Sequence, residues 1–363
     1  MFEFYIILLS LCTAMLSAPL LPVIMQSIPA WMQKYSERSG ASYQKLNLKS
    51  NLYDKLRKSL SDVKGQELAI NTIINSVCGW SESKKNNLDN ASGGLVIHMA
   101  GVSGTGKSMA ANILANKLSK DSAIRISYSS INTADKRSCA EQLFGSYTEK
   151  SVFNTDIKCN TSYTSQLIYN PEVVIVIDEF DKFMLRDDSL QALLWDVADT
   201  GRLKVDKDTY IDCSKTIFIL TSNASKESIK LKIDKLKTDD SDSLETVSFK
   251  QAFLNRITSV YFENFSKYIY KEILINHLVP IKEYYSKKYN LFINFKDDVL
   301  DCMAMELSNM KTGGARNVGI FKKKIYSAIN RFKRENGISE SYCKNRYDVN
   351  VTYDNGKCKI IKK

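Results

Sequence analysis

Residues 101–108 read GVSGTGKS and contain the residue types that bind phosphate groups. They fit the pattern G-x-x-x-x-G-K-[ST], in which glycines let the backbone bend into a cradle of N–H groups. Lys107 would reach the β and γ phosphates, and the Ser108 hydroxyl would bind Mg²⁺. The stretch therefore predicts a nucleotide site. Its nucleotide-binding residues are predicted to be Gly101, Gly104, Thr105, Gly106, Lys107 and Ser108.

Two carboxylates, Asp178 and Glu179, directly follow the apolar run at residues 173–177. At a strand end, Asp178 would lie beside the Mg²⁺ and Glu179 could polarise an attacking water. Paired acids at a strand end can also form an ordinary turn. Because a phosphate loop lies upstream, a role of the two acids in nucleotide hydrolysis explains the pair better than an ordinary turn does.

The elements that position these residues follow an α/β pattern. An apolar run at 94–100 precedes the phosphate loop, and a helix-like run at 109–118 follows it. Further strands are predicted at 123–128 and 173–177, and at 216–220, which leads to Asn223. Continuous β-branched runs are typical of central parallel strands covered on both faces. Because parallel strands present their carboxyl ends at one edge, we expect Asn223 near the phosphate loop, orienting water or the γ phosphate.

The C-terminal third is predicted to be largely helical from residue 267 to residue 334. Gly314 to Arg316 opens a basic amphipathic helix. Beyond it, strand-like halves around Asn355-Gly356 predict a β-hairpin.

Composition indicates a globular protein of 363 residues, with 44% hydrophobic and 25% charged residues. Lys and Arg outnumber Asp and Glu by 51 to 40, which weakly favours acidic partners. No recognisable nucleic-acid-reading motif supports a nucleic-acid partner. The eight cysteines have no zinc-type spacing with the two histidines, and His98 is predicted to be a core residue. Cys343 and Cys358 could pair or stay reduced.

Residues 4–32 carry no charged side chain and are long enough to cross a bilayer. Three prolines break the second half of the segment. The start lacks the basic residues of a signal peptide, so we expect an uncleaved membrane anchor. Basic residues after the segment would keep the rest of the chain on the cytoplasmic side. The predicted divisions are an anchor at 1–33, a basic linker and helix at 34–60, a large α/β domain at 61–265 and a small helical domain at 266–363.

The motifs, taken in order, resemble those of AAA+ ATPases of the Clp class, especially the second ATPase module of ClpB disaggregases. The torsins are similar as well, through FILTSNAS and the N-terminal apolar segment. The resemblance covers roughly residues 51–363. It rests on VKGQ at 63–66, GVSGTGKS at 101–108, IDEFDK at 177–182, GRL at 201–203, LTSN at 220–223, FLNRI at 253–257 and GAR at 314–316.

This resemblance implies a P-loop fold with a parallel-sheet αβα core and a small helical lid ending in a β-hairpin. It implies ATP and Mg²⁺ as cofactors, and a ring of identical subunits, with a hexamer expected. The implied roles are phosphate and Mg²⁺ binding by Lys107 and Ser108, Mg²⁺ binding by Asp178, catalysis by Glu179, sensor 1 for Asn223, an arginine finger offered to the neighbouring subunit for Arg256, and sensor 2 for Arg316.

The sequence differs from the Clp class at one place and from the torsins at another. The region 144–163 lacks the aromatic-glycine pore loop of the Clp class, whereas Arg256 and Ala315-Arg316 differ from the torsins. We expect a membrane-anchored ATPase that remodels protein clients. The alternatives are a partner-activated, torsin-like ATPase in the endoplasmic reticulum lumen or nuclear envelope, a nucleotide-gated scaffold, and, less favoured, a nucleic-acid motor.

Overall fold

The computed structural model describes one compact unit, which lies within Lys45–Lys363. The predicted anchor at 1–33 and most of the predicted linker lie outside the described residues. Within the described ranges, no helix combines the length and apolar character needed to cross a bilayer. The described residues are 46–48, 51–86, 93–119, 123–145, 163, 167, 170–204, 210–223, 251–310, 313–338, 345–354 and 356–363.

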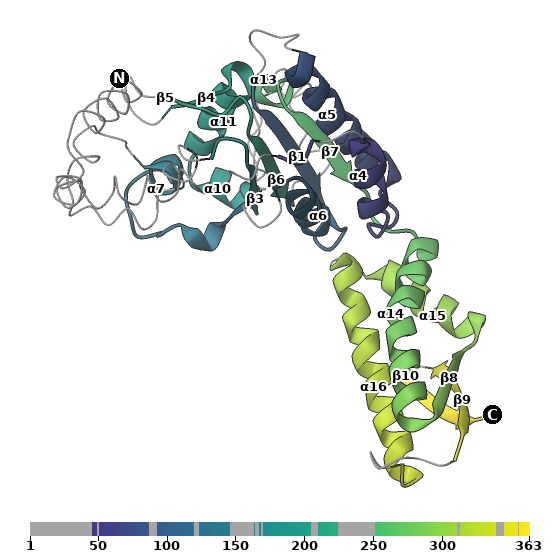
Figure 1. The fold of residues 1–363 in the computed structure, drawn as a ribbon. Coiled ribbons are helices and arrows are strands. Elements are labelled where there is room, and N and C mark those ends of the chain that lie inside the picture. Colours follow the sequence, from purple (N-terminus) through teal and green to yellow (C-terminus); the bar gives the residue numbers. More distant parts are fainter. Residues whose placement is uncertain are drawn as a thin grey trace, which may run out of the picture. The chain divides into compact units, whose positions relative to one another are not determined.

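A five-stranded parallel sheet forms the centre of the large domain (Figure 1). Its strand order is β2-β3-β6-β1-β7. β1 and β6 are buried along their whole length, as their continuous apolar runs predict. The fifth strand, β7, was not predicted. The bounds are β1 Leu95–Gly101, β2 Ile124–Ser127, β3 Val174–Asp178, β6 Ile217–Ser222 and β7 Thr258–Phe262.

Helices cover both faces of this sheet, and alternate residues of each strand belong to different cores. Val96 and Ile175 pack with α7, α10 and α11, whereas Ile97 and Val174 pack with α4, α5 and α6. The predicted αβα core is therefore confirmed. The helices are α4 Leu52–Leu60, α5 Glu67–Asn86, α6 Lys107–Ser119, α7 Cys139–Phe144, α10 Phe180–Arg186 and α11 Ser189–Thr200.

Short elements connect the main layers. A two-stranded antiparallel sheet follows α11 directly, and its inner residues Leu203 and Ile211 join the core beside α11. These elements are η3 Tyr128–Ser130, β4 Arg202–Lys204, β5 Tyr210–Asp212 and α13 Gln251–Leu254.

Residues 266–363, the predicted small helical domain, have a core of their own and are called the lid below. Three helices and a three-stranded sheet enclose its core, in which Phe321 and Leu291 are fully buried. Burying one such side chain contributes about 1.5–3 kcal/mol. The predicted hairpin is confirmed as β9 and β10. The elements are α14 Lys267–Tyr289, β8 Leu291–Phe295, α15 Asp297–Asn309, η5 Gly314–Asn317, α16 Val318–Glu335, β9 Tyr347–Asp354 and β10 Lys357–Lys362.

The prediction that residues 267–334 are largely helical is confirmed, because α14, α15 and α16 occupy most of this stretch. Strand β8, at residues 291–295, was not predicted, and it pairs in parallel with β9. Asn290 ends α14 in the left-handed conformation, with φ 50°. The chain can therefore reverse into a strand whose alternate residues, Leu291 and Ile293, are buried.

Candidate functional site

The phosphate loop joins β1 to α6 at the carboxyl edge of the sheet. Gly104 and Gly106 have φ of 84° and 103°, a region that side chains disfavour. A Cβ on Gly104 would lie 2.1 Å from the Gly313 carbonyl oxygen, so glycine is required there by space as well. Thr105 is buried and donates to the Val102 carbonyl at 2.8 Å, which closes the turn.

Lys107 is buried, with 6% of its surface exposed, at the start of α6. Its ammonium group donates to the carbonyls of Gly101 and Val102, each at 2.8 Å, and to Asn223 Oδ1 at 3.3 Å. Burial lowers the pKa of Lys107 to about 8, and the charge of Arg316 adds to this effect. Such a desolvated, directed cation is suited to contacting phosphate oxygens.

Ser108 and Asp178 meet across the site. Ser108 Oγ donates to Asp178 Oδ1 at 3.2 Å, and Thr221 Oγ1 donates to the same carboxylate oxygen. A hydroxyl and a carboxylate are hard oxygen ligands of the kind that Mg²⁺ prefers. The residues present therefore fit the predicted Mg²⁺ position. Within the described ranges, no group of three His, Cys, Asp or Glu side chains forms any other metal site.

Glu179 occupies the turn between β3 and α10 in the left-handed conformation, with φ 58°. Its N–H donates to Thr221 Oγ1 at 3.2 Å. The Glu179 carboxylate pairs with Lys182, with Oε2 and Nζ 2.8 Å apart. A non-glycine residue with positive φ is uncommon and concentrates at functional sites.

Asn223 lies at the end of β6, where its side-chain oxygen faces Lys107. The residues at the end of β6 contact side chains from different elements. Thr221 contacts Asp178 of β3, and Ser222 Oγ is 2.8 Å from Nε2 of His98 in β1. The prediction that His98 is a core residue is confirmed, because it is fully buried.

Arg316 reaches the site from the lid. Its guanidinium donates to Ser103 Oγ at 3.1 Å, and the neighbouring Ala315 N–H donates to the Gly104 carbonyl at 2.9 Å. The lid thus contacts the phosphate loop through both backbone and side chain. The structure brings Arg316 to the site formed by the large domain.

Arg256 lies apart from the residues that line this site. It follows α13, stacks 4.9 Å from the centre of the Trp195 ring and pairs with Asp199, with Nε and Oδ1 3.0 Å apart. Sequence reasoning did not single out Asp181, the third acid of the segment DEFD. Its negative charge opposes the effect of burial on the pKa of Lys107.

The converging groups enclose a cavity of about 270 Å³. It opens where the phosphate loop, the ends of β3 and β6 and the lid meet. The lining residues are Ser103, Gly104, Gly106, Lys107, Ser108, Met109, Asp178, Glu179, Thr221, Ser222, Asn223, Ala315 and Arg316.

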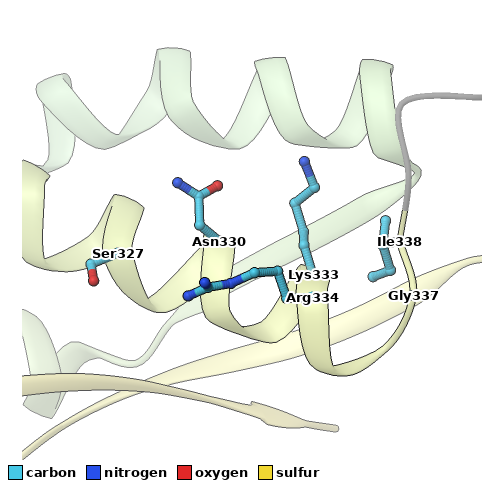
Figure 2. Close-up of a pocket in the computed structure, with 6 residues that line it drawn as sticks. All are labelled: Ser327, Asn330, Lys333, Arg334, Gly337 and Ile338. Carbon is cyan, nitrogen blue, oxygen red and sulfur yellow. The ribbon is translucent and has the colours of Figure 1, made fainter.

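A second, larger pocket, of about 850 Å³, lies on the lid near the end of α16 (Figure 2). Its lining includes Lys333 and Arg334 but no carboxylate from the described residues. Lys333 also lies 3.4 Å from the centre of the Tyr289 ring. The described residues of this lining place no acid beside a base or a nucleophile.

The family comparison agrees with this geometry. Residues 94–260 match the family model of the AAA domain (Cdc48 subfamily). These residues are therefore similar to an AAA domain. The matched stretch includes the phosphate loop, Asp178, Glu179, Asn223 and Arg256.

Two relatives extend the comparison. The chain is 25% identical over 170 residues to the chaperone protein ClpB of Yersinia enterocolitica, which covers 45% of this chain and 19% of that protein. The chain therefore matches about a fifth of the length of this curated relative. The S. cerevisiae Hsp104–ADP complex matches with a TM-score of 0.57 and 24% identity, over 86% of this chain and 53% of that chain. This structural likeness shows that the fold is AAA+.

Proposed function

We propose that this chain binds ATP with Mg²⁺ at the phosphate-loop cavity and hydrolyses it. The observation that supports this most is the convergence of Lys107, the Ser108–Asp178 pair and Glu179 at one cavity. The chaperone named ClpB and the ADP complex of Hsp104 are relatives consistent with nucleotide binding.

Each residue has a role that its position supports. Lys107 and the loop N–H groups would hold the phosphates, while Ser108 and Asp178 would hold Mg²⁺. Bound Mg²⁺ would supply positive charge that offsets the charge on the phosphate oxygens. Glu179 would orient and polarise the attacking water, and Asn223 would hold that water or the γ phosphate in line. Arg316 would contact the phosphates from the lid.

Hydrolysis is proposed to drive the remodelling of protein clients by a ring of identical subunits, with a hexamer expected. Arg256 supports this, because it is exposed and does not line the cavity of its own chain, as suits a finger offered to a neighbouring subunit. The relation to a chaperone supports a protein client. Steady-state hydrolysis that rises with protein concentration and with an unfolded protein such as casein would support this reading. A flat, negligible rate would favour a partner-activated, torsin-like ATPase or a scaffold.

We also propose that residues 1–33 anchor the chain in a membrane, with the ATPase on the cytoplasmic side. The uncharged segment at 4–32 and the basic residues after it support this. Co-sedimentation with liposomes should require this segment. Glycosylation of the chain in cells would instead favour the endoplasmic reticulum lumen.

The nucleotide proposal is tested by Glu179→Gln. The variant should keep the affinity for ADP, because Lys107 and Ser108 remain, but it should hydrolyse ATP at least about 100-fold more slowly. Unchanged turnover in this variant would remove Glu179 from the chemistry. Failure of the unmodified chain to bind ADP would overturn the proposed function itself.

A further inference from the structure

Thr221 is a buried polar residue of the central strand β6, and the proposed mechanism gives it no role. Its exposed fraction is 2%, although it lines the cavity. β6 lies between β3 and β1, and Thr221 is in register with Met99 of β1. Burying a hydroxyl costs free energy unless it is hydrogen-bonded. The partners of this hydroxyl therefore indicate its role.

The Thr221 hydroxyl connects the two acidic residues of the site. It donates to Asp178 Oδ1 and accepts from the N–H of Glu179 at 3.2 Å. Both hydrogen bonds can form at once, because a hydroxyl has one proton to donate and lone pairs with which to accept. One side chain thus contacts the residue proposed to hold Mg²⁺ and the residue proposed to polarise water.

At Asp178, Thr221 shares its acceptor with Ser108. Ser108 Oγ donates to the same oxygen, Oδ1, at 3.2 Å. Ser108 is itself a proposed Mg²⁺ ligand, whereas Thr221 is not, so the bond from Thr221 serves only to orient the carboxylate. Hydrogen-bond partners of a metal-binding carboxylate fix its direction and tune its affinity for the metal.

At Glu179, Thr221 stabilises a strained turn. Glu179 has φ 58° and ψ 44°, a left-handed conformation that costs free energy for a residue with a Cβ. This conformation sets the direction in which the Glu179 side chain leaves the backbone. The hydrogen bond to its N–H comes from β6, a strand buried along its whole length. The turn is therefore supported by a rigid part of the sheet.

The hydroxyl is not needed to form the strand. Valine has nearly the shape of threonine and is equally suited to strands. A residue that only filled space at position 221 could be valine, which would avoid burying a polar group. The two hydrogen bonds to Asp178 and Glu179 account for a threonine here.

We propose that Thr221 is a positioning residue that holds Asp178 and Glu179 in one arrangement, so that Mg²⁺ binding and water activation depend on the same hydroxyl. The inference rests on the proposed function, because it assigns Thr221 a role in the same nucleotide site. Thr221 acts through the two acidic residues and neither binds the ion nor transfers a proton.

Thr221→Val in the 363-residue chain removes the hydroxyl and keeps the shape of the side chain. It should lower kcat for ATP by at least about tenfold, a usual loss when the partner of a metal ligand is removed. The affinity of the ADP complex for Mn²⁺ should fall by about tenfold for the same reason. Electron paramagnetic resonance of free Mn²⁺ measures this affinity without turnover. Without metal, the affinity for ADP should stay within about twofold, because Lys107 and the loop N–H groups remain.

Thr221→Ser keeps the hydroxyl, so it should retain at least about half of kcat and of the Mn²⁺ affinity. Thr216→Val is the matched control. Thr216 directly precedes β6 at its other end, is fully buried and donates to the Pro171 carbonyl at 2.6 Å, outside the cavity. Its replacement removes an equivalent buried hydroxyl, yet kcat and Mn²⁺ affinity should stay unchanged.

Urea unfolding shows whether each variant is folded, and Thr221→Ala takes the place of the valine variant if that variant is not. Unchanged kcat in the variant without a hydroxyl would overturn the proposal, as would a loss confined to kcat or to Mn²⁺ affinity alone. Equal losses in Thr221→Ser and Thr221→Val would also overturn it, since the hydroxyl would then have no effect.

ADP binding separates the two proposals. If the unmodified chain binds no ADP, the proposed function fails, whatever the behaviour of Thr221. If it binds and hydrolyses nucleotide but Thr221→Val has no effect, only the role of Thr221 fails.

Discussion

Lys182 forms an ion pair with Glu179, the proposed catalytic carboxylate, with Nζ 2.8 Å from Oε2. The two side chains lie one turn apart at the start of α10, and their hydrogen bond raises the pKa of Lys182. Both are well exposed, at 45% and 42%, so the pair is weak. Glu179 can therefore leave Lys182 to meet a water molecule at little cost in free energy.

Lys182→Met should accordingly raise kcat, by up to about fivefold, because an exposed pair holds Glu179 by no more than about 1 kcal/mol. ADP affinity should stay the same. Steady-state hydrolysis at saturating ATP is the measurement. Lys287→Met is the matched control, since Lys287 pairs with Glu283 on an exposed face of α14. A lower kcat in Lys182→Met would mean that the pair orients Glu179 productively.

Gly104→Ala should weaken ADP binding by at least about tenfold and destabilise the fold by about 1–3 kcal/mol. The added Cβ would meet the Gly313 carbonyl oxygen of the lid at 2.1 Å, and φ is 84°. Calorimetric titration and urea unfolding measure the two effects. Gly319→Ala is the control, because its Cβ would meet nothing within 4 Å in α16. That change should be neutral or stabilise by up to about 1 kcal/mol.

The motifs predicted which residues would meet, because the carboxyl ends of parallel strands share an edge. The runs that formed β3 and β6 were recognised since they are continuous and fully apolar. In contrast, β7 has only two buried residues, Val260 and Phe262, so its sequence carries a weak strand pattern. The five-residue β8 depends on a partner, β9, that lies more than 50 residues later. Non-local pairing of this kind leaves little local signal.

The contacts between the site residues were harder to predict from the sequence than the identity of those residues. The pairing of His98 with Ser222 depends on β1 and β6 being neighbours, and the motifs do not encode that strand order. Such supporting residues require the three-dimensional structure.

His98 should make the protein sensitive to acid. Burial, together with the charge of Lys107, lowers the pKa of His98 to about 4 from 6.5. The fold therefore favours neutral His98. The resulting stability is fully present above about pH 6.5 and is lost as pH falls towards 4, by about 3 kcal/mol in all.

The non-titrating variant His98→Gln should show a flatter dependence of the unfolding free energy on pH between 7 and 4.5. Urea unfolding at a series of pH values is the measurement. His277→Gln is the matched control, because the only other histidine is exposed on α14. Equal slopes for the unmodified chain and His98→Gln would show that His98 does not control acid stability.

Arg256 should act on the nucleotide of a neighbouring subunit. Its contacts within the chain, to Asp199 and the Trp195 ring, hold it on the exposed surface near α11 and do not bring it to the cavity. Arg256→Ala should thus lower hydrolysis by about 1000-fold, a typical loss for an arginine finger, with ADP affinity almost unchanged.

Mixing two inactive variants distinguishes action between subunits from action within one. Glu179→Gln has an inactive cavity but an intact Arg256, whereas Arg256→Ala has an intact cavity but no arginine to offer. If Arg256 acts between subunits, an Arg256→Ala subunit beside a Glu179→Gln subunit has its own Glu179 and receives the Arg256 of its neighbour. The cavity of that Arg256→Ala subunit is then complete. The mixture should then hydrolyse ATP much faster than either variant alone, with a maximum near equal amounts. A mixture no more active than its parts would place the effect of Arg256 within its own subunit, where it pairs with Asp199.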